Sequence, residues 1–95
     1  MLAETSVVLR LRVRNHPGVM SHVCGLFARR AFNVDGIACL PIGDGAESVV
    51  LLLVSEDDRL AQLVRQLAKL EDVLAIERDP NGGATFAALA SHCAA

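Results

Sequence analysis

The chain has 95 residues, of which 53% are hydrophobic and 21% are charged, and its formal net charge is −2 at pH 7. This length corresponds to one domain with a small core, and the apolar content excludes an intrinsically disordered chain. The longest strongly apolar run, residues 49–54, is too short for a membrane-spanning helix, and no secretory signal is visible at the N-terminus, so we expect a cytoplasmic protein with no membrane partner.

The first element predicted along the chain is a strand over residues 6–14. Apolar residues alternate there with a second set that contains three arginines, so one face of the strand is apolar and the other is mostly basic. The next four residues, Asn15-His-Pro-Gly18, have the composition of a turn. A helix is predicted from Val19 to about Ala31, because its apolar residues recur at helical spacing.

Residues 37–42 and 48–54 are predicted to form a hairpin, because Gly43-Asp-Gly45 between them is a strong turn signal. A second helix is predicted to open at Ser55–Asp58, where a capping residue and acidic side chains suit a helix N-terminus. A short last strand follows at residues 73–76. The alanine-rich segment 84–95 is expected to form a weak helix or to remain frayed.

The predicted order is strand-helix-strand-strand-helix-strand, which indicates the ferredoxin-like α+β fold. Right-handed crossovers in this order place both helices on one face of a four-stranded antiparallel sheet. The predicted domain covers residues 1–79, with residues 80–95 as a weakly helical or disordered tail. Because residues 49–54 are apolar on both faces of their strand, we expect a second copy to cover the open sheet face. Cover by the tail is the less favoured alternative, since alanine-rich segments make poor covers.

Catalytic and metal-binding chemistry is poorly represented in this sequence, and we predict no catalytic residue and no metal site. The adjacent carboxylates flank the second predicted helix, where capping and solvation explain them, and no phosphate-binding glycine motif occurs. Cys24, Cys39 and Cys93 have no ligand spacing and are expected to be reduced thiols. RNA-binding modules of similar fold stack bases on strand aromatics, whereas the three phenylalanines here fall outside the predicted strands, so no nucleic-acid partner is expected.

The most informative stretch is residues 15–20 together with Asn33. A helix N-terminus preceded by Pro-Gly exposes backbone N–H groups that suit a carboxylate. The side-chain oxygens of Asn15 and Asn33 could accept from an ammonium group, and the small apolar side chains of Val19, Val34 and Ile37 leave room for a short aliphatic side chain. These features together describe a free amino acid as ligand. The alternative is purely structural: Asn15 caps the helix and Gly18 turns the chain.

Residues 13–37, VRNHPGVMSHVCGLFARRAFNVDGI, closely resemble the small regulatory subunit of acetohydroxyacid synthase, also called acetolactate synthase. The resemblance continues through Cys39-Leu-Pro-Ile42 and more loosely to about Arg78. The whole span looks like one ACT domain, the amino-acid-sensing form of this fold. The length of the chain resembles the short, isozyme I type of small subunit.

This resemblance implies a noncatalytic subunit in branched-chain amino-acid biosynthesis, with valine as its feedback effector. Its partner would be a catalytic large subunit that uses thiamine diphosphate, Mg²⁺ and FAD, with no cofactor on this chain. The small subunit would raise the activity of the large one, and two ACT domains would form a homodimer with the effector between them. The effector residues carried over from the family are Asn15, His16, Gly18, Val19, Met20, Asn33 and Val34. Backbone N–H groups of Gly18, Val19 and Met20 are the expected carboxylate ligands, and His16 either shapes the loop or faces the catalytic subunit.

Two other functions remain open at this point. A small phosphatase of the acylphosphatase type would need an arginine in a phosphate-cradling loop after the first strand; Arg14 is near, but the loop is Asn-His-Pro-Gly. A stand-alone ACT-domain sensor that acts on another target would share every argument from the fold.

Overall fold

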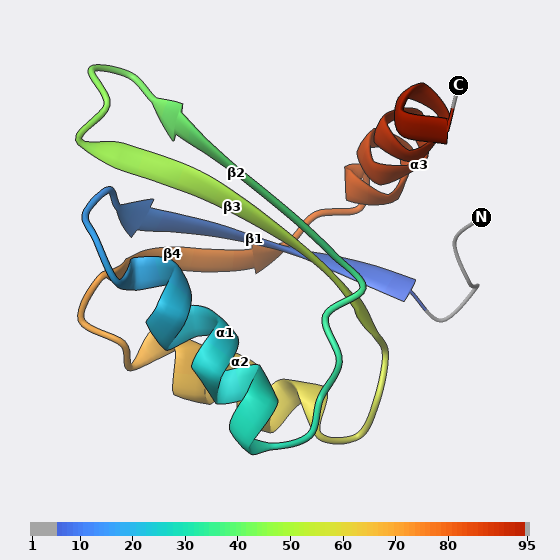
Figure 1. Cartoon of the computed structure of the whole chain (residues 1–95). Helices are drawn as coiled ribbons and strands as arrows, with labels where there is room; N and C mark the ends of the chain where they lie inside the picture. The colour runs from blue at the N-terminus through green and yellow to red at the C-terminus, as the bar shows by residue number, and fades with distance from the viewer. Residues whose placement is uncertain (1–5, 95) are drawn as a thin grey trace.

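Residues 6–94, which the computed structural model describes, form four strands and three helices (Figure 1). In chain order these elements are β1 (Ser6–Arg14), α1 (Val19–Arg29), β2 (Gly36–Ile42), β3 (Glu47–Ser55), α2 (Leu60–Ala68), β4 (Val73–Arg78) and α3 (Gly82–Ala94). The predicted order of strands and helices is confirmed up to β4, and the tail adds a helix.

The four strands form one antiparallel sheet in the order β2-β3-β1-β4. β1 lies inside the sheet and pairs with β3 along its full length, from Ser6 opposite Ser55 to Arg14 opposite Glu47. α1 and α2 cover one face of the sheet, whereas α3 lies on the other side (Figure 1). The predicted α+β class, with a four-stranded antiparallel sheet and two helices on one face, is therefore confirmed.

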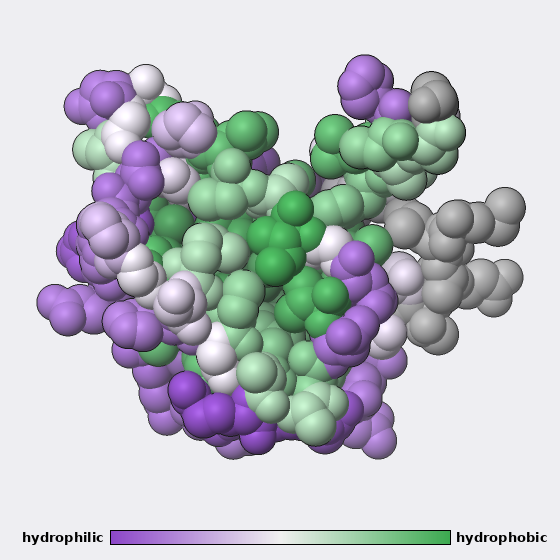
Figure 2. All heavy atoms as spheres, in the orientation of Figure 1, coloured by the Kyte–Doolittle hydropathy of each residue, from purple (hydrophilic) through white to green (hydrophobic). Residues whose placement is uncertain are grey.

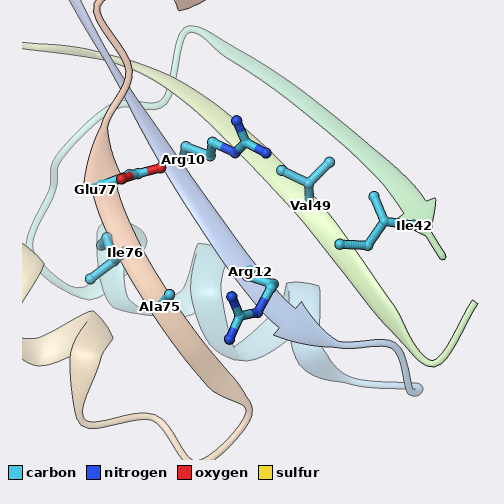
Figure 3. A pocket seen from close by; sticks show the side chains of 7 residues that line it. All are labelled: Arg10, Arg12, Ile42, Val49, Ala75, Ile76 and Glu77. Carbon is cyan, nitrogen blue, oxygen red and sulfur yellow. The ribbon is translucent and has the colours of Figure 1, made fainter.

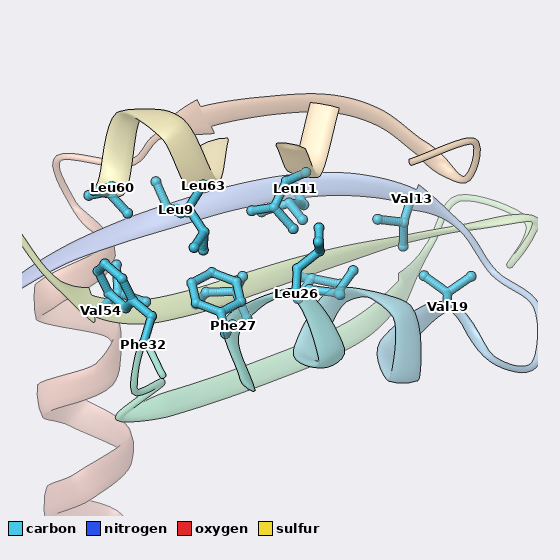
Figure 4. Packing of buried hydrophobic residues seen from close by; sticks show 14 residues of the cluster. Leu9, Leu11, Val13, Val19, Leu26, Phe27, Phe32, Val54, Leu60 and Leu63 are labelled. Carbon is cyan, nitrogen blue, oxygen red and sulfur yellow. The ribbon is translucent and has the colours of Figure 1, made fainter. Parts of the chain in front are cut away.

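The main core lies between the sheet and the helices α1 and α2. Side chains on a strand alternate between faces, so Leu9, Leu11 and Val13 of β1 point toward the helices, as do alternate residues of β3. The helices supply Val23, Phe27 and the α2 leucines from their apolar stripes (Figure 4). The predicted periodicities of both strands and both helices thus converge on one core.

A smaller apolar cluster lies on the opposite sheet face, beneath α3. Phe86 of α3 is buried there against Val8 and Leu53. Two glycines permit this close approach: a Cβ on Gly82 would lie 2.5 Å from Val8, and one on Gly36 would lie 3.0 Å from the Phe86 ring. The expectation that the alanine-rich tail makes a poor cover is wrong at this end of the sheet, because a single phenylalanine supplies the apolar area.

Element boundaries differ from the predictions by a few residues. α1 ends at Arg29 rather than near Ala31, which has a φ of +51° and turns the chain out of the helix. α2 begins at Leu60 rather than within residues 55–58. The Arg59 backbone N–H, just before the helix, donates a 2.7 Å hydrogen bond to Asp57 Oδ1. β4 continues to Arg78, which lies opposite Leu9 of β1. The first two differences depend on local contacts and the third on pairing with the distant strand β1, and none changes the topology.

Candidate functional site

Asn15 joins the loop after β1 to the turn between β2 and β3. Its backbone N–H donates to the Ala46 carbonyl at 3.0 Å, and its Nδ2 donates to the Gly45 carbonyl at 2.8 Å. Asn15 therefore does not cap α1; it fastens the loop after β1 to the β2–β3 turn instead. Its exposed side-chain oxygen has no hydrogen-bond partner among the described residues and can accept from a ligand.

Gly18 occupies the N-cap position of α1 with a φ of +91°, in the left-handed region that favours glycine. No side chain caps this helix. The Val19 N–H makes only a long 3.5 Å contact with the His16 carbonyl, and the N–H groups of Gly18 and Met20 have no hydrogen-bond partner within residues 6–94. The N-terminus of α1 therefore carries backbone donors that no described residue uses, which is what a carboxylate site requires.

His16 ties the same loop to the turn between α2 and β4. Its Nε2 lies 2.7 Å from Asp72 Oδ1, and its Nδ1 lies 2.7 Å from the Pro17 carbonyl. Both ring nitrogens thus face acceptors, which only the doubly protonated imidazolium satisfies. The hydrogen bond to Asp72 and the one to the Pro17 carbonyl raise the pKa of His16 above its usual value of 6.5. His16 therefore shapes the loop within this chain.

Arg14 takes part in the same attachment. Its backbone N–H donates to the Asp72 carbonyl at 2.9 Å, and its Nη1 donates to the Glu71 carbonyl at 2.8 Å. The guanidinium is thus directed toward the α2–β4 turn rather than into the Asn15–Gly18 loop. This geometry argues against a phosphate cradle of the acylphosphatase type.

Asn33 and Val34 lie at the other end of α1, in the segment that leads into β2. Asn33 is exposed, and its Nδ2 donates to Asp35 Oδ1 at 2.5 Å, which directs the amide along this segment. Val34 is half-buried against the main core. The backbone here is held by a 2.8 Å hydrogen bond from the Asp35 N–H to the Leu53 carbonyl.

The structure brings five of the seven predicted site residues together and separates the other two from them. Residues 15–20 surround the start of α1, whereas Asn33 and Val34 follow its end. α1 has 11 residues, so about 16 Å of helix lies between the two groups. A single chain therefore does not arrange the backbone donors and both asparagines around one small ligand.

Sequence reasoning missed a shallow hollow on the open sheet face. It has a volume of about 290 Å³ and is lined by residues of all four strands, including Arg10, Arg12 and Glu77 (Figure 3). Arg12 Nε lies 3.0 Å from Glu47 Oε1, so this arginine already has a partner. The hollow depends on the register of four strands, which no local pattern reports. No aromatic residue lines it, so it offers no platform for base stacking.

No group of three or more histidine, cysteine or acidic residues within residues 6–94 is placed to hold a metal ion. None of the described helices is long and apolar enough to cross a membrane.

Comparison with known proteins gives one consistent result. Residues 9–75 match the family model described as the AHAS small subunit-like ACT domain, where AHAS is acetohydroxyacid synthase. The acetolactate synthase isozyme 1 small subunit of Escherichia coli K12 is 58% identical over 81 residues, which cover 85% of this chain and 84% of that protein. A probable acetolactate synthase small subunit of Methanothermobacter thermautotrophicus is 35% identical over 89 residues, covering 90% of this chain and 50% of that protein.

A solved structure supports the same relationship. The acetolactate synthase small subunit of Thermotoga maritima superposes with a TM-score of 0.67 at 32% identity, covering 79% of this chain and 48% of that one. The chain thus spans about half the length of these longer relatives and most of the length of the isozyme 1 subunit. With the fold, the family model and the relatives in agreement, this chain belongs to the ACT domains of acetolactate synthase small subunits.

Proposed function

We propose that this chain is the noncatalytic regulatory subunit of an acetolactate synthase and that it binds valine for feedback control. The observation that carries the proposal is the start of α1. Backbone N–H groups and the Asn15 side-chain oxygen, none of which has a hydrogen-bond partner within residues 6–94, belong there to one loop that is fastened at both sides. These donors and this acceptor match the carboxylate and ammonium groups of an amino acid.

In this proposal the binding site is completed by a second copy of the chain. The N–H groups of Gly18, Val19 and Met20 hold the valine carboxylate, and Asn15 accepts from the ammonium group. Asn33 and Val34 of the other copy contribute a second amide and an apolar wall. The 16 Å of helix between the two groups supports this arrangement, because one copy cannot supply both to a single ligand. Two such sites follow from two-fold symmetry.

The catalytic chemistry belongs to a separate large subunit, which carries thiamine diphosphate, Mg²⁺ and FAD, and this chain raises its activity in the cytoplasm. Valine acts by coupling: it orders the loop and the interface of the regulatory dimer and so changes how this dimer supports the large subunit. Couplings of this kind typically amount to roughly 1–3 kcal/mol.

The test is the valine response of the reconstituted holoenzyme carrying Gly18→Asp. The new carboxylate lies where the ligand carboxylate is placed, so valine inhibition should be lost while activation of the large subunit is retained. Gly43→Asp is the matched control, since Gly43 also has a positive φ and open space around its Cβ position. Normal inhibition of the Gly18→Asp enzyme would show that the site has been placed wrongly.

Asn33→Ala tests the second half of the site by calorimetric titration with valine, with glycine and lysine as control ligands. Asn33 is exposed, so its truncation leaves the core intact. Loss of a hydrogen bond to a charged group should weaken valine binding about tenfold or more. Unchanged affinity would remove Asn33 from the site. Copurification of the chain with a catalytic subunit separates this function from that of a stand-alone sensor.

A further inference from the structure

The exposed large hydrophobic side chains of the described residues are confined to two elements, β2 and α3. Ile37, Leu40 and Ile42 of β2 are 47%, 61% and 37% exposed, and Leu89 of α3 is 44% exposed. β2 contains no charged residue, and the only ionisable side chains of α3 are those of His92 and Cys93. An edge strand without charges is poorly protected against pairing with another chain. These two elements therefore form one candidate interaction surface.

β2 is one of the two edge strands of the sheet, with β4 at the other edge, and α3 extends beyond β2. α3 begins at Gly82, which lies against Val8 of β1, and continues to Phe86, which packs on Leu53 of β3 and reaches Gly36 at the start of β2. In Figures 1 and 4, α3 continues beyond the edge of the sheet that is formed by β2. The C-terminal half of α3 thus projects past the free edge.

A hollow of about 500 Å³ lies between this projecting half and the start of β2. It is lined by Gly36, Ile37 and Leu53 on the sheet side and by Phe86, Leu89 and Ala90 on the helix side. Figure 2 shows hydrophobic residues on α3 and on the neighbouring body of the molecule, with a notch between them. Within one copy nothing among the described residues fills this space.

We propose that α3 is a dimer arm, which covers the partner's sheet when two copies of this chain pair along β2. The proposal rests on the homodimer of the proposed function and adds α3 to its interface. A two-fold axis normal to the sheet sets the two β2 strands antiparallel, with Gly36 of one copy beside Ile42 of the other. Leu53 of β3 packs against α3, and residues two apart on a strand lie on the same face of the sheet, so Val49 and Glu47 lie on the α3 face as well. Leu40 and Ile42 pair with Val49 and Glu47, and they therefore also lie on the face that α3 covers.

The arm of each copy therefore arrives over Leu40 and Ile42 of the other. Leu89 and Ala90 meet these side chains, and the partner fills the hollow that one copy leaves open. Pro41 removes one backbone donor from the paired edge, so side-chain packing has to contribute more to this interface than in an ordinary strand pair. The same contact occurs twice, as a two-fold interface requires.

The first experiment is sedimentation analysis of the full chain as wild type, Leu89→Asp, Leu40→Asp and Ala88→Asp. Leu40 is 61% and Leu89 44% exposed in one copy, and neither belongs to a buried core cluster, so both variants should still fold, with a cooperative thermal unfolding transition. Each should raise the dimer dissociation constant at least tenfold. Ala88 is exposed on α3 but does not line the hollow, so its aspartate should change the constant less than twofold.

The second experiment locates the contact directly in a dimer of one ¹³C-labelled and one unlabelled copy. Isotope-filtered NOEs between the Leu89 methyl groups of one copy and the Leu40 or Ile42 methyl groups of the other are expected. A wild-type dimer that lacks these NOEs and in which Leu89→Asp behaves as Ala88→Asp would overturn the arm, while the valine site of the proposed function would stand. A chain that remains monomeric with and without valine would overturn both.

Discussion

His16 is held by two acceptors, and this makes the attachment of the proposed effector loop sensitive to pH. The hydrogen bond to Asp72 and the one to the Pro17 carbonyl both raise its pKa, while nearby Arg14 acts in the opposite direction. A histidine whose pKa is higher in the folded than in the unfolded protein stabilises the folded state when it is protonated. This stabilisation is fully present below pH 6.5, the usual pKa of histidine, and is lost as the pH rises through the higher pKa of the folded protein. The loop is therefore fastened most firmly in mildly acidic solution.

We predict that an NMR titration gives His16 a pKa above 6.5, and that Asp72→Asn lowers it, because the substitution removes the anionic acceptor. A His16 titration that Asp72→Asn leaves unchanged would mean that the ring does not contact Asp72 in solution.

For single residues, the sequence indicated which groups can bind a ligand better than it indicated which partners those residues have in the fold. It predicted the N–H groups without hydrogen-bond partners among the described residues at the start of α1, because Pro-Gly before an amphipathic stretch is a local signal. It offered helix capping as one role of Asn15, whereas the side chain bonds to Gly45, 30 residues away. Partners this far along the chain leave no local trace in the sequence.

Among the elements, α3 shows how two missing side chains allow a helix to pack closely on a sheet. A Cβ on Gly82 would lie 2.5–2.9 Å from three atoms of Val8, whose short branched side chain has no flexible end to move away. The helix is therefore placed by the absence of atoms at Gly82 and Gly36 and by the presence of one ring at Phe86.

We predict that Gly82→Ala lowers the free energy of unfolding by about 1–3 kcal/mol, the usual cost of overpacking a close contact. Gly25→Ala is the matched control inside α1, where a Cβ would only reach Arg29 at 3.4 Å. This control should raise the free energy of unfolding by about 0.5–1 kcal/mol, because alanine is the better helix former. Urea unfolding of both variants measures the difference, and equal effects would show that α3 does not contact Val8.

The strands and helices themselves were largely predictable. Alternation in β1 and β3 and the helical spacing in α1 and α2 are set within a few residues, and each confirmed element buries the face that its pattern predicted. α3 was harder to predict, since an alanine-rich segment has a weak pattern and its position depends on Val8 and Gly36 in distant strands.

At the scale of the whole molecule, the division of the proposed site between the two ends of α1 links valine binding to dimerisation. If both halves touch one ligand, valine must bind the dimer more tightly than the monomer, and it must then favour the dimer by the same free energy. Valine at 100 times its dissociation constant should stabilise the folded dimer by about 2.7 kcal/mol for each of its two sites.

We therefore predict that saturating valine lowers the dimer dissociation constant and raises the melting temperature, while glycine and lysine do neither. Sedimentation analysis at a protein concentration near the dimer dissociation constant measures the first effect, and thermal unfolding measures the second. Asn33→Ala should reduce both, because it removes the contribution of one copy to the ligand. Equal valine affinity for monomer and dimer would contradict a shared site.

The sequence by itself determined the order of the elements, the face that each one buries, the class of fold and the family, since these depend on local periodicity and on a long specific motif. Only the tertiary structure decided that Asn15 is bonded to Gly45 in the turn between β2 and β3, that α3 crosses the open sheet face, and that Arg10 and Arg12 share a hollow with β4. The physical reason is the same in each case. Strand register and helix placement arise from contacts between residues far apart in the chain, which no local pattern encodes.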